Sequence, residues 1–124
     1  MRGKKIVLDL EFIPYRRKQE PYCVHEIIEI GAVALDADNE IYDEFQMYVK
    51  PQYGTVPPFV TAITGITNEM LVGQVSFSEA MQAFEAWLPQ KEPYRFYTWS
   101  GSDQHVFQAE AEWKERPLLG NFYG

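Results

Sequence analysis

Residues 6–12, IVLDLEF, decide the fold, because they combine the pattern of a buried strand with two acids. The apolar residues predict a strand, and successive side chains of a strand point to opposite faces. Asp9 and Glu11 therefore share one face with Val7. Neighbouring carboxylates repel each other, and a pair of oxygen ligands suits a hard cation such as Mg²⁺ or Mn²⁺. The alternative is that the strand ends near Asp9 and both acids face water.

Composition restricts the classes of protein and site that remain possible. The chain has 124 residues, of which 46% are hydrophobic, which predicts one folded domain, residues 1–124, rather than a disordered segment. The single cysteine, Cys23, excludes an internal disulfide and a cysteine-rich zinc site. Two histidines, His25 and His105, are too few to predict a zinc centre.

Charge and hydropathy also bear on partners. A net charge of −7 argues against broad wrapping of duplex nucleic acid, but it does not exclude a small acidic pocket in which metals contact a phosphate. The sequence has no apolar run near the length of a membrane span, and its start does not resemble a signal peptide. We therefore expect a soluble, cytoplasmic protein with no membrane partner.

Two further strands are expected to pair with the first. Residues 27–35 are apolar on both faces apart from Glu29, which is typical of a central strand. After a turn at residues 36–40, apolar and polar residues alternate over residues 44–49, which predicts a strand with one wet face. These two strands are predicted to form an antiparallel hairpin beside residues 6–12.

The remaining pattern alternates helices and a strand. Residues 59–63 predict a short helix that stops at Thr64-Gly65, and Ser76 with Glu79 fits a capping box that opens a longer helix. Residues 94–99 predict a fourth strand, and a weaker helix is expected to begin near Asp103. The order predicts an α/β domain with a mixed sheet. The apolar stripe of the longer helix is interpreted as core and comprises Phe77, Ala80, Met81, Phe84, Trp87 and Leu88.

Four segments together resemble the DEDD-type (DEDDh-like) 3′→5′ exonucleases, which have a ribonuclease H-like fold. They are Asp9-x-Glu11, residues 25–33 (HEIIEIGAV), residues 64–67 (TGIT), and Asp103 after the fourth strand. They occur in the order found in the family and cover most of the chain, so their conjunction is more specific than any one of them.

The resemblance implies a site and a reaction. Asp9, Glu11 and Asp103 match three of the four metal-binding acids of the family, whose members hydrolyse phosphodiester bonds with two Mg²⁺ or Mn²⁺ ions. Phe12 and residues 64–66 (Thr64, Gly65, Ile66) match the family's substrate-binding positions near the terminal nucleotide. Gly65 has a second interpretation as an ordinary glycine that ends a helix.

The sequence also departs from the family pattern. The family has a fourth aspartate with a histidine or tyrosine a few residues before it, but no aspartate follows Asp103 here. His105, two residues after Asp103, would point about 200° away on a helix, so it is interpreted as a surface or packing residue. The chain therefore resembles the N-terminal two-thirds of the family domain and is C-terminally incomplete by that comparison. We expect its activity to be impaired. We also expect either self-association or a completing chain.

Two classes of function follow from these observations. The first is a 3′→5′ exonuclease domain that acts by two-metal catalysis on the 3′ end of single-stranded DNA or RNA. The second is a non-catalytic nuclease-fold module for binding or assembly. A metal-dependent phosphohydrolase of another family is a third, weaker alternative.

Overall fold

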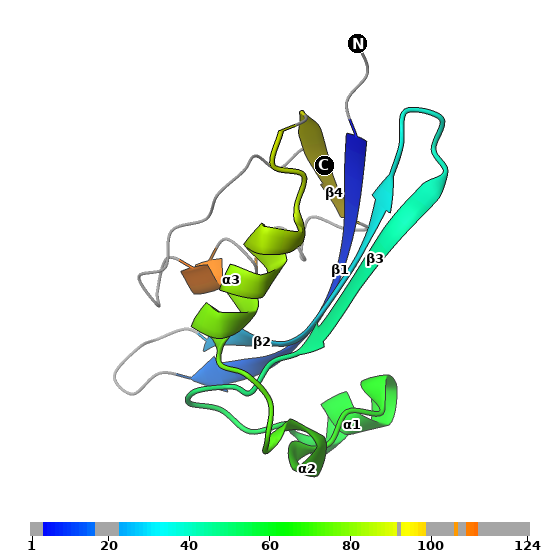
Figure 1. The fold of residues 1–124 in the computed structure, drawn as a ribbon. Coiled ribbons are helices and arrows are strands. Elements are labelled where there is room, and N and C mark those ends of the chain that lie inside the picture. Colours follow the sequence, from blue (N-terminus) through cyan, green and yellow to red (C-terminus); the bar gives the residue numbers. More distant parts are fainter. Residues whose placement is uncertain (1–3, 17–22, 92, 99–105, 107–108, 112–124) are drawn as a thin grey trace.

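In the computed structural model, four strands form one mixed sheet in the order β3-β2-β1-β4 (Figure 1). The structure describes residues 4–16, 23–91, 93–98, 106 and 109–111. The strands are β1 (Lys4–Arg16), β2 (Cys23–Leu35), β3 (Ile41–Tyr48) and β4 (Tyr94–Thr98). β1 pairs antiparallel with β2 and parallel with β4, and β2 pairs antiparallel with β3. This confirms the predicted α/β class, the hairpin and the place of the first strand beside it.

The turn between β2 and β3 is stabilised by local hydrogen bonds from its own residues. One carboxylate oxygen of Asp36 accepts the N–H groups of Asp38 and Glu40 at 2.9 and 3.0 Å. Asn39 adopts a positive φ of 64°, which asparagine tolerates better than most residues. The turn predicted at residues 36–40 therefore has the chemistry that its sequence indicates.

Helix α3 (Phe77–Trp87) begins with the capping box that the sequence predicts. The Ser76 side chain accepts the Glu79 N–H at 3.2 Å, and the Glu79 carboxylate accepts the Ser76 N–H at 3.0 Å. Hydrogen bonds from the Ser76 backbone and then from its side chain lower the pKa of Glu79. Two N–H groups that a helix start leaves without intrahelical partners are satisfied in this way.

Helix α3 covers one face of the sheet and forms the larger core with it (Figure 1). The Phe84 ring, 1% exposed, lies 6.0 Å from the ring of Phe96 on β4 and 5.4 Å from that of Phe45 on β3. Val106 and Ala111 are helical and buried in the same core, so these described residues of the weaker predicted helix pack here. We call this core the α3-face cluster; its buried members include Ile6, Leu8, Leu10, Ile27, Ile30, Ala32, Ala34, Ala80, Met81 and Leu88.

A smaller core lies under helices α1 (Pro58–Thr64) and α2 (Asn68–Leu71). We call it the α1–α2 cluster; its buried members are Ile13, Ile28, Val56, Val60, Ile66 and Leu71. Helix α1 confirms the short predicted helix. Helix α2 was not predicted, because four residues are too few to show a helical period; the Thr67 side chain caps it by accepting the Met70 N–H at 3.2 Å.

A β-bulge in the β1–β2 ladder separates the two cores. Glu11 pairs with Glu29, but the next residue, Phe12, pairs with Ile27, so β2 has one extra residue at Ile28. The extra residue breaks the alternation of faces. Ile28 consequently belongs to the α1–α2 cluster, whereas Ile30, two residues later, belongs to the α3-face cluster. Among the helices of the described part of the chain, none is long and apolar enough to span a membrane.

Candidate functional site

Asp9 and Glu11 lie two residues apart on β1, on the face of the sheet opposite α3. The even-numbered neighbours Leu8 and Leu10 are buried under α3, whereas Asp9 is exposed and Glu11 is half-buried. The two acids therefore share a face, as the sequence predicts. The strand does not end near Asp9, since β1 continues to Arg16. Asp9 nevertheless faces solvent, so its charge does not require a buried counterion.

An open hollow lies next to Asp9 on this face. Gly31 pairs with Asp9 across the ladder, and a Cβ atom at Gly31 would lie 3.4 Å from the Asp9 carbonyl oxygen. Because glycine has no side chain, residue 31 does not fill the space beside Asp9. The hollow has a volume of about 460 Å³ and is lined by Val7, Asp9, Gly31, Ala32, Val33, Glu44, Phe45 and Gln46.

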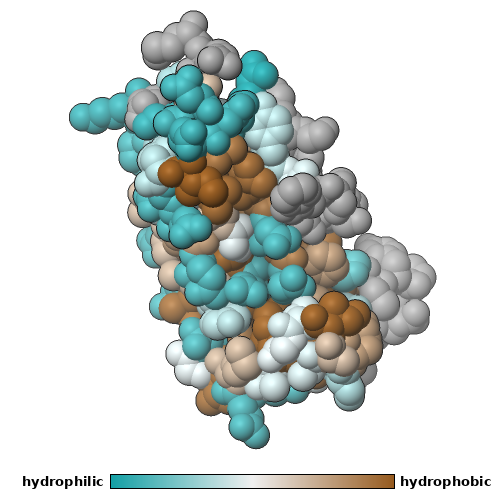
Figure 2. All heavy atoms as spheres, turned by 90° about the vertical axis from the view of Figure 1, so that its right-hand side faces the viewer, coloured by the Kyte–Doolittle hydropathy of each residue, from teal (hydrophilic) through white to brown (hydrophobic). Residues whose placement is uncertain are grey.

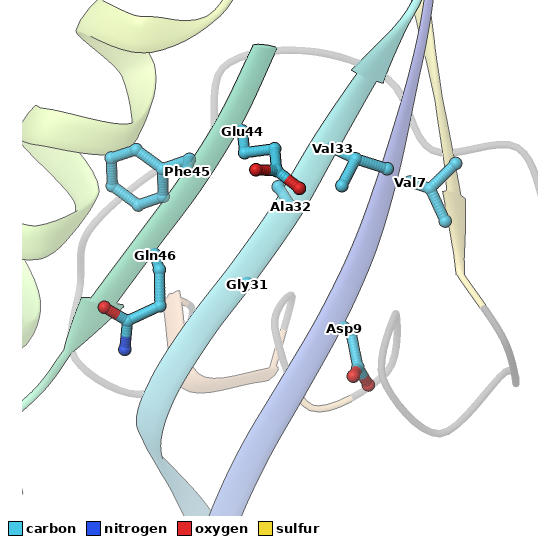
Figure 3. Close-up of a pocket in the computed structure, with 8 residues that line it drawn as sticks. All are labelled: Val7, Asp9, Gly31, Ala32, Val33, Glu44, Phe45 and Gln46. Carbon is cyan, nitrogen blue, oxygen red and sulfur yellow. The ribbon is translucent and has the colours of Figure 1, made fainter. Parts of the chain in front are cut away.

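The side chains that line the hollow divide between the two faces of the sheet (Figure 3). The ring of Phe45 points toward helix α3, whereas Asp9 and Val33 lie on the opposite side. Seen from that side, hydrophobic and hydrophilic residues are interspersed over the surface (Figure 2). The face that carries Asp9 is thus more polar than the α3 face of the same strands.

Glu29 is a third acid on this face. It pairs with Glu11 in the ladder, and its carboxylate accepts a hydrogen bond from the Gln46 side-chain amide at 2.9 Å. The ladder therefore brings the carboxylates of Glu11 and Glu29 to opposed positions on one face. The sequence showed Glu29 as the one polar residue of an apolar strand but gave it no role, because its partner depends on the register.

The predicted substrate segment ends helix α1 and borders the same face. Gly65 is the C-cap with φ 80° and ψ −2°, and its N–H donates to the Thr61 carbonyl at 2.8 Å. A Cβ atom at Gly65 would meet nothing within 4 Å, so its conformation, rather than a close contact, favours glycine. The Ile66 side chain is buried in the α1–α2 cluster, and the Thr64 hydroxyl accepts the Ile66 N–H at 3.0 Å.

Phe12 lies on the other side of the sheet from Glu11. It is half-buried against the α3-face cluster and forms an edge-to-face contact with His25 at 5.3 Å between ring centroids. His25 therefore packs against an aromatic ring. The structure brings Asp9, Glu11 and Ile66 to one face, and it places the Phe12 side chain on the opposite face.

Two buried glutamates were missed by sequence reasoning. Glu26, 0% exposed, accepts backbone N–H groups from the loop after β3, with the shortest bonds from Gln52 at 2.8 Å and Gly54 at 2.6 Å. Glu110, also 0% exposed, accepts the N–H of Ile27 at 2.6 Å. Their partners are backbone atoms of distant residues, so no local sequence pattern indicates them.

The metal-binding potential of the described residues is limited to part of a site. Asp103, the third predicted ligand, lies outside the described residues. Within the ranges that are described, no group of three or more His, Cys, Asp or Glu side chains is arranged to hold a metal ion. Asp9 and Glu11 supply oxygen atoms, which fit the preference of Mg²⁺ and Mn²⁺, but a complete site requires further ligands.

Comparison with known families and curated proteins finds nucleases. The RNase_T family, described as Exonuclease, matches residues 6–113. The human 3′-5′ exoribonuclease 1 is 35% identical over 82 residues, which are 64% of this chain and 24% of that protein. The DNA polymerase III subunit epsilon of Pasteurella multocida is 37% identical over 81 residues, which are 65% of this chain and 32% of that protein. The chain thus spans about a quarter to a third of these relatives.

Solved structures of nucleases have the same fold as this chain. The nuclease domain of 3′hExo, a DEDDh family member bound to rAMP, superposes with a TM-score of 0.75 at 25% identity, over 94% of this chain and 61% of that one. Escherichia coli exonuclease I in complex with a dT13 oligonucleotide gives a TM-score of 0.69 at 14% identity, over 90% of this chain and 24% of that one, which shows the fold alone. The ribonuclease H-like fold of the DEDDh nucleases is therefore the fold of this chain.

Proposed function

Because the chain belongs to the RNase_T exonuclease family, we propose that residues 1–124 form one domain that hydrolyses phosphodiester bonds at the 3′ end of single-stranded DNA or RNA. The observation that carries the proposal is the position of Asp9 and Glu11. They are side by side on one strand and accessible to solvent, on the face that α1 borders. Relatives named as an exoribonuclease and as a polymerase subunit support both substrate classes.

We assign Asp9, Glu11 and Asp103 as ligands of Mg²⁺ or Mn²⁺. The oxygen donors of Asp9 and Glu11 fit these hard cations, and Glu29 places a third carboxylate opposite Glu11 on the same face. When bound, two such ions activate the attacking water and stabilise the charge that develops on phosphorus and on the leaving oxygen. The chain itself contributes rigidity, because β1 pairs with β2 at Asp9 and with β4 up to the preceding residue, Leu8.

The end of helix α1 is proposed to receive the terminal nucleotide. Ile66 anchors this segment in the α1–α2 cluster together with Ile13, which lies two residues beyond Glu11 on the same face of β1. Gly65 is exposed, with open space where a side chain would be. A nucleotide could therefore approach the backbone there while remaining close to the acids.

A nuclease assay tests the proposal directly. The chain is incubated with a 5′-end-labelled single strand and Mn²⁺ or Mg²⁺, and shortening from the 3′ end is followed on a gel. Asp9→Asn should abolish the activity, because it removes a ligand charge. Asp38→Asn makes the same chemical change at an exposed turn and should leave the rate unchanged. Equal rates for the wild type and Asp9→Asn would refute the proposal.

The isolated 124-residue chain is expected to be slow. No aspartate follows Asp103 and no histidine follows His105, so the sequence offers no counterpart of the family's general base. A positioned general base contributes about 10²- to 10⁴-fold to rate. The expected rate is therefore low but dependent on Asp9. Binding of the labelled strand with no cleavage by any variant would instead favour the alternative of a non-catalytic binding module.

Self-association of the chain, or a separate completing chain, is proposed to complete the site or to cover the open face.

 Light scattering gives the molar mass of the chain in solution, and a dimer that gains activity with concentration would identify a second copy as the completing chain. A monomer whose rate per chain is independent of concentration would exclude that role for a second copy.

A further inference from the structure

We propose that Glu110 is a positioning residue, whose buried carboxylate holds the β2 bulge and thereby keeps the end of helix α1 packed on the face that carries Glu11. Its effect on catalysis rests on the function proposed above, whereas its effect on the bulge does not. Glu110 lies far from β2 in sequence, yet it accepts the Ile27 N–H at 2.6 Å and is 0% exposed.

The hydrogen bond between the Ile27 N–H and Glu110 lies next to the β-bulge of the sheet. Ile27 is buried, so its N–H requires an acceptor within the protein, and a carboxylate is a stronger acceptor than a neutral group. The bulge begins at the neighbouring residue, where Glu11 pairs with Glu29 and Phe12 with Ile27. Glu110 therefore fixes the backbone of β2 directly beside the register shift.

The register shift decides which core each side chain joins. Ile28 belongs to the α1–α2 cluster, although Ile30, two residues later, belongs to the α3-face cluster. A slip of one residue in a strand moves side chains to the opposite face, so loss of the bulge would remove Ile28 from its cluster. Ile66 packs in that cluster, and the segment after α1 would lose part of its support.

Glu26, the residue directly before Ile27, is a second buried glutamate that stabilises this part of β2. Its carboxylate accepts the backbone N–H groups of Gln52, Tyr53 and Gly54, which ties the loop after β3 to the residue before Ile27. The two glutamates thus act on different partners. Glu26 secures a loop, whereas Glu110 secures the strand that lies opposite Glu11.

The proposal is tested with Glu110→Ala and Glu110→Gln in the full chain. In Glu110→Ala, hydrogen exchange of the Ile27 N–H, followed by NMR, should become roughly tenfold faster, as expected for loss of one buried hydrogen bond. The apparent Mn²⁺ affinity should fall roughly tenfold, and kcat roughly a hundredfold with KM unchanged. Glu110→Gln keeps an acceptor oxygen and should restore Ile27 protection, Mn²⁺ affinity and kcat.

A control separates positioning from general destabilisation. Leu88→Ala removes a buried side chain at the end of α3 and should lower the melting temperature without changing Mn²⁺ affinity. Equal Mn²⁺ affinity in Glu110→Ala and Leu88→Ala would overturn the proposal. If Glu110→Ala does not fold, Glu110→Gln decides, and intact Ile27 protection with lost Mn²⁺ affinity would also overturn it.

The outcome is independent of whether the chain proves to be a nuclease. Ile27 exchange and Mn²⁺ affinity are measured without a substrate, so an inactive wild type would refute the proposed function and leave the positioning role testable. Conversely, an active enzyme in which Glu110→Ala changes neither quantity would retain the proposed function and lose the positioning role.

Discussion

The two faces of the sheet differ in how they use the same strands. The α3 face is covered by the amphipathic helix α3, with the helical residues Val106 and Ala111 buried beside it, and forms a continuous apolar core. The opposite face is divided between the smaller α1–α2 cluster and an open hollow beside Asp9. Alternation along β1 lets one strand serve both faces, since Leu8 and Leu10 point into the core while Asp9 points to solvent. One face therefore provides stability, and the other leaves room for a site.

The largest expected effect is on the α3 face. Phe84→Ala should lower the free energy of unfolding by about 3–5 kcal/mol, because the ring is 1% exposed and its removal leaves a cavity among other rings. Urea unfolding followed by circular dichroism measures the change. Gln82→Ala, at an exposed position of the same helix, is the control and should change stability by less than about 0.5 kcal/mol.

The second effect tests whether the α1–α2 cluster is a real core. Ile66→Ala should cost about 2–4 kcal/mol, since Ile66 is 2% exposed in that cluster. Ile63→Ala makes the same change at a side chain that is 80% exposed and should cost less than about 0.5 kcal/mol. Similar urea midpoints for the two variants would contradict the division of this face into a packed end and an open end.

A smaller effect is expected at the end of helix α1. Gly65→Ala should cost about 1–2 kcal/mol, because alanine at φ 80° is strained although the added Cβ atom meets nothing. Gly73 also has open space around it but lacks a positive φ, so Gly73→Ala is the matched control and should be better tolerated. Thermal melting of both variants measures the difference, and equal melting temperatures would show that backbone strain is not decisive at Gly65.

The smallest stability effect is expected at the open face. Asp9→Ala in metal-free buffer should change stability by less than about 0.5 kcal/mol or raise it slightly, because it removes an exposed charge close to Glu11. Mn²⁺ should raise the melting temperature of the wild type and have less effect on the variant. A large loss of stability without metal would show that Asp9 has a structural partner.

Local patterns in the sequence predicted much of this architecture. The capping box at Ser76, the helix end at Gly65 and the turn at Asp36 all form where residue types satisfy nearby backbone groups. The β2–β3 hairpin with β1 beside it followed from short connections and from the alternation of apolar residues, whereas the place of β4 beside β1 was not predicted. Helix α2 was missed, because a single capped turn has no period to detect.

The sequence by itself determined that Asp9 and Glu11 share a face, because the alternation of side chains along a strand is a local property of the backbone. The tertiary structure alone decided the bulge at Ile28 and the partners of Glu26 and Glu110. Those features depend on which backbone N–H groups distant segments bring together, and a buried N–H donates to whatever oxygen the packing places beside it. The physical reason is that a ladder's register and a buried polar contact are set by three-dimensional packing, which no spacing of residues in the chain encodes directly.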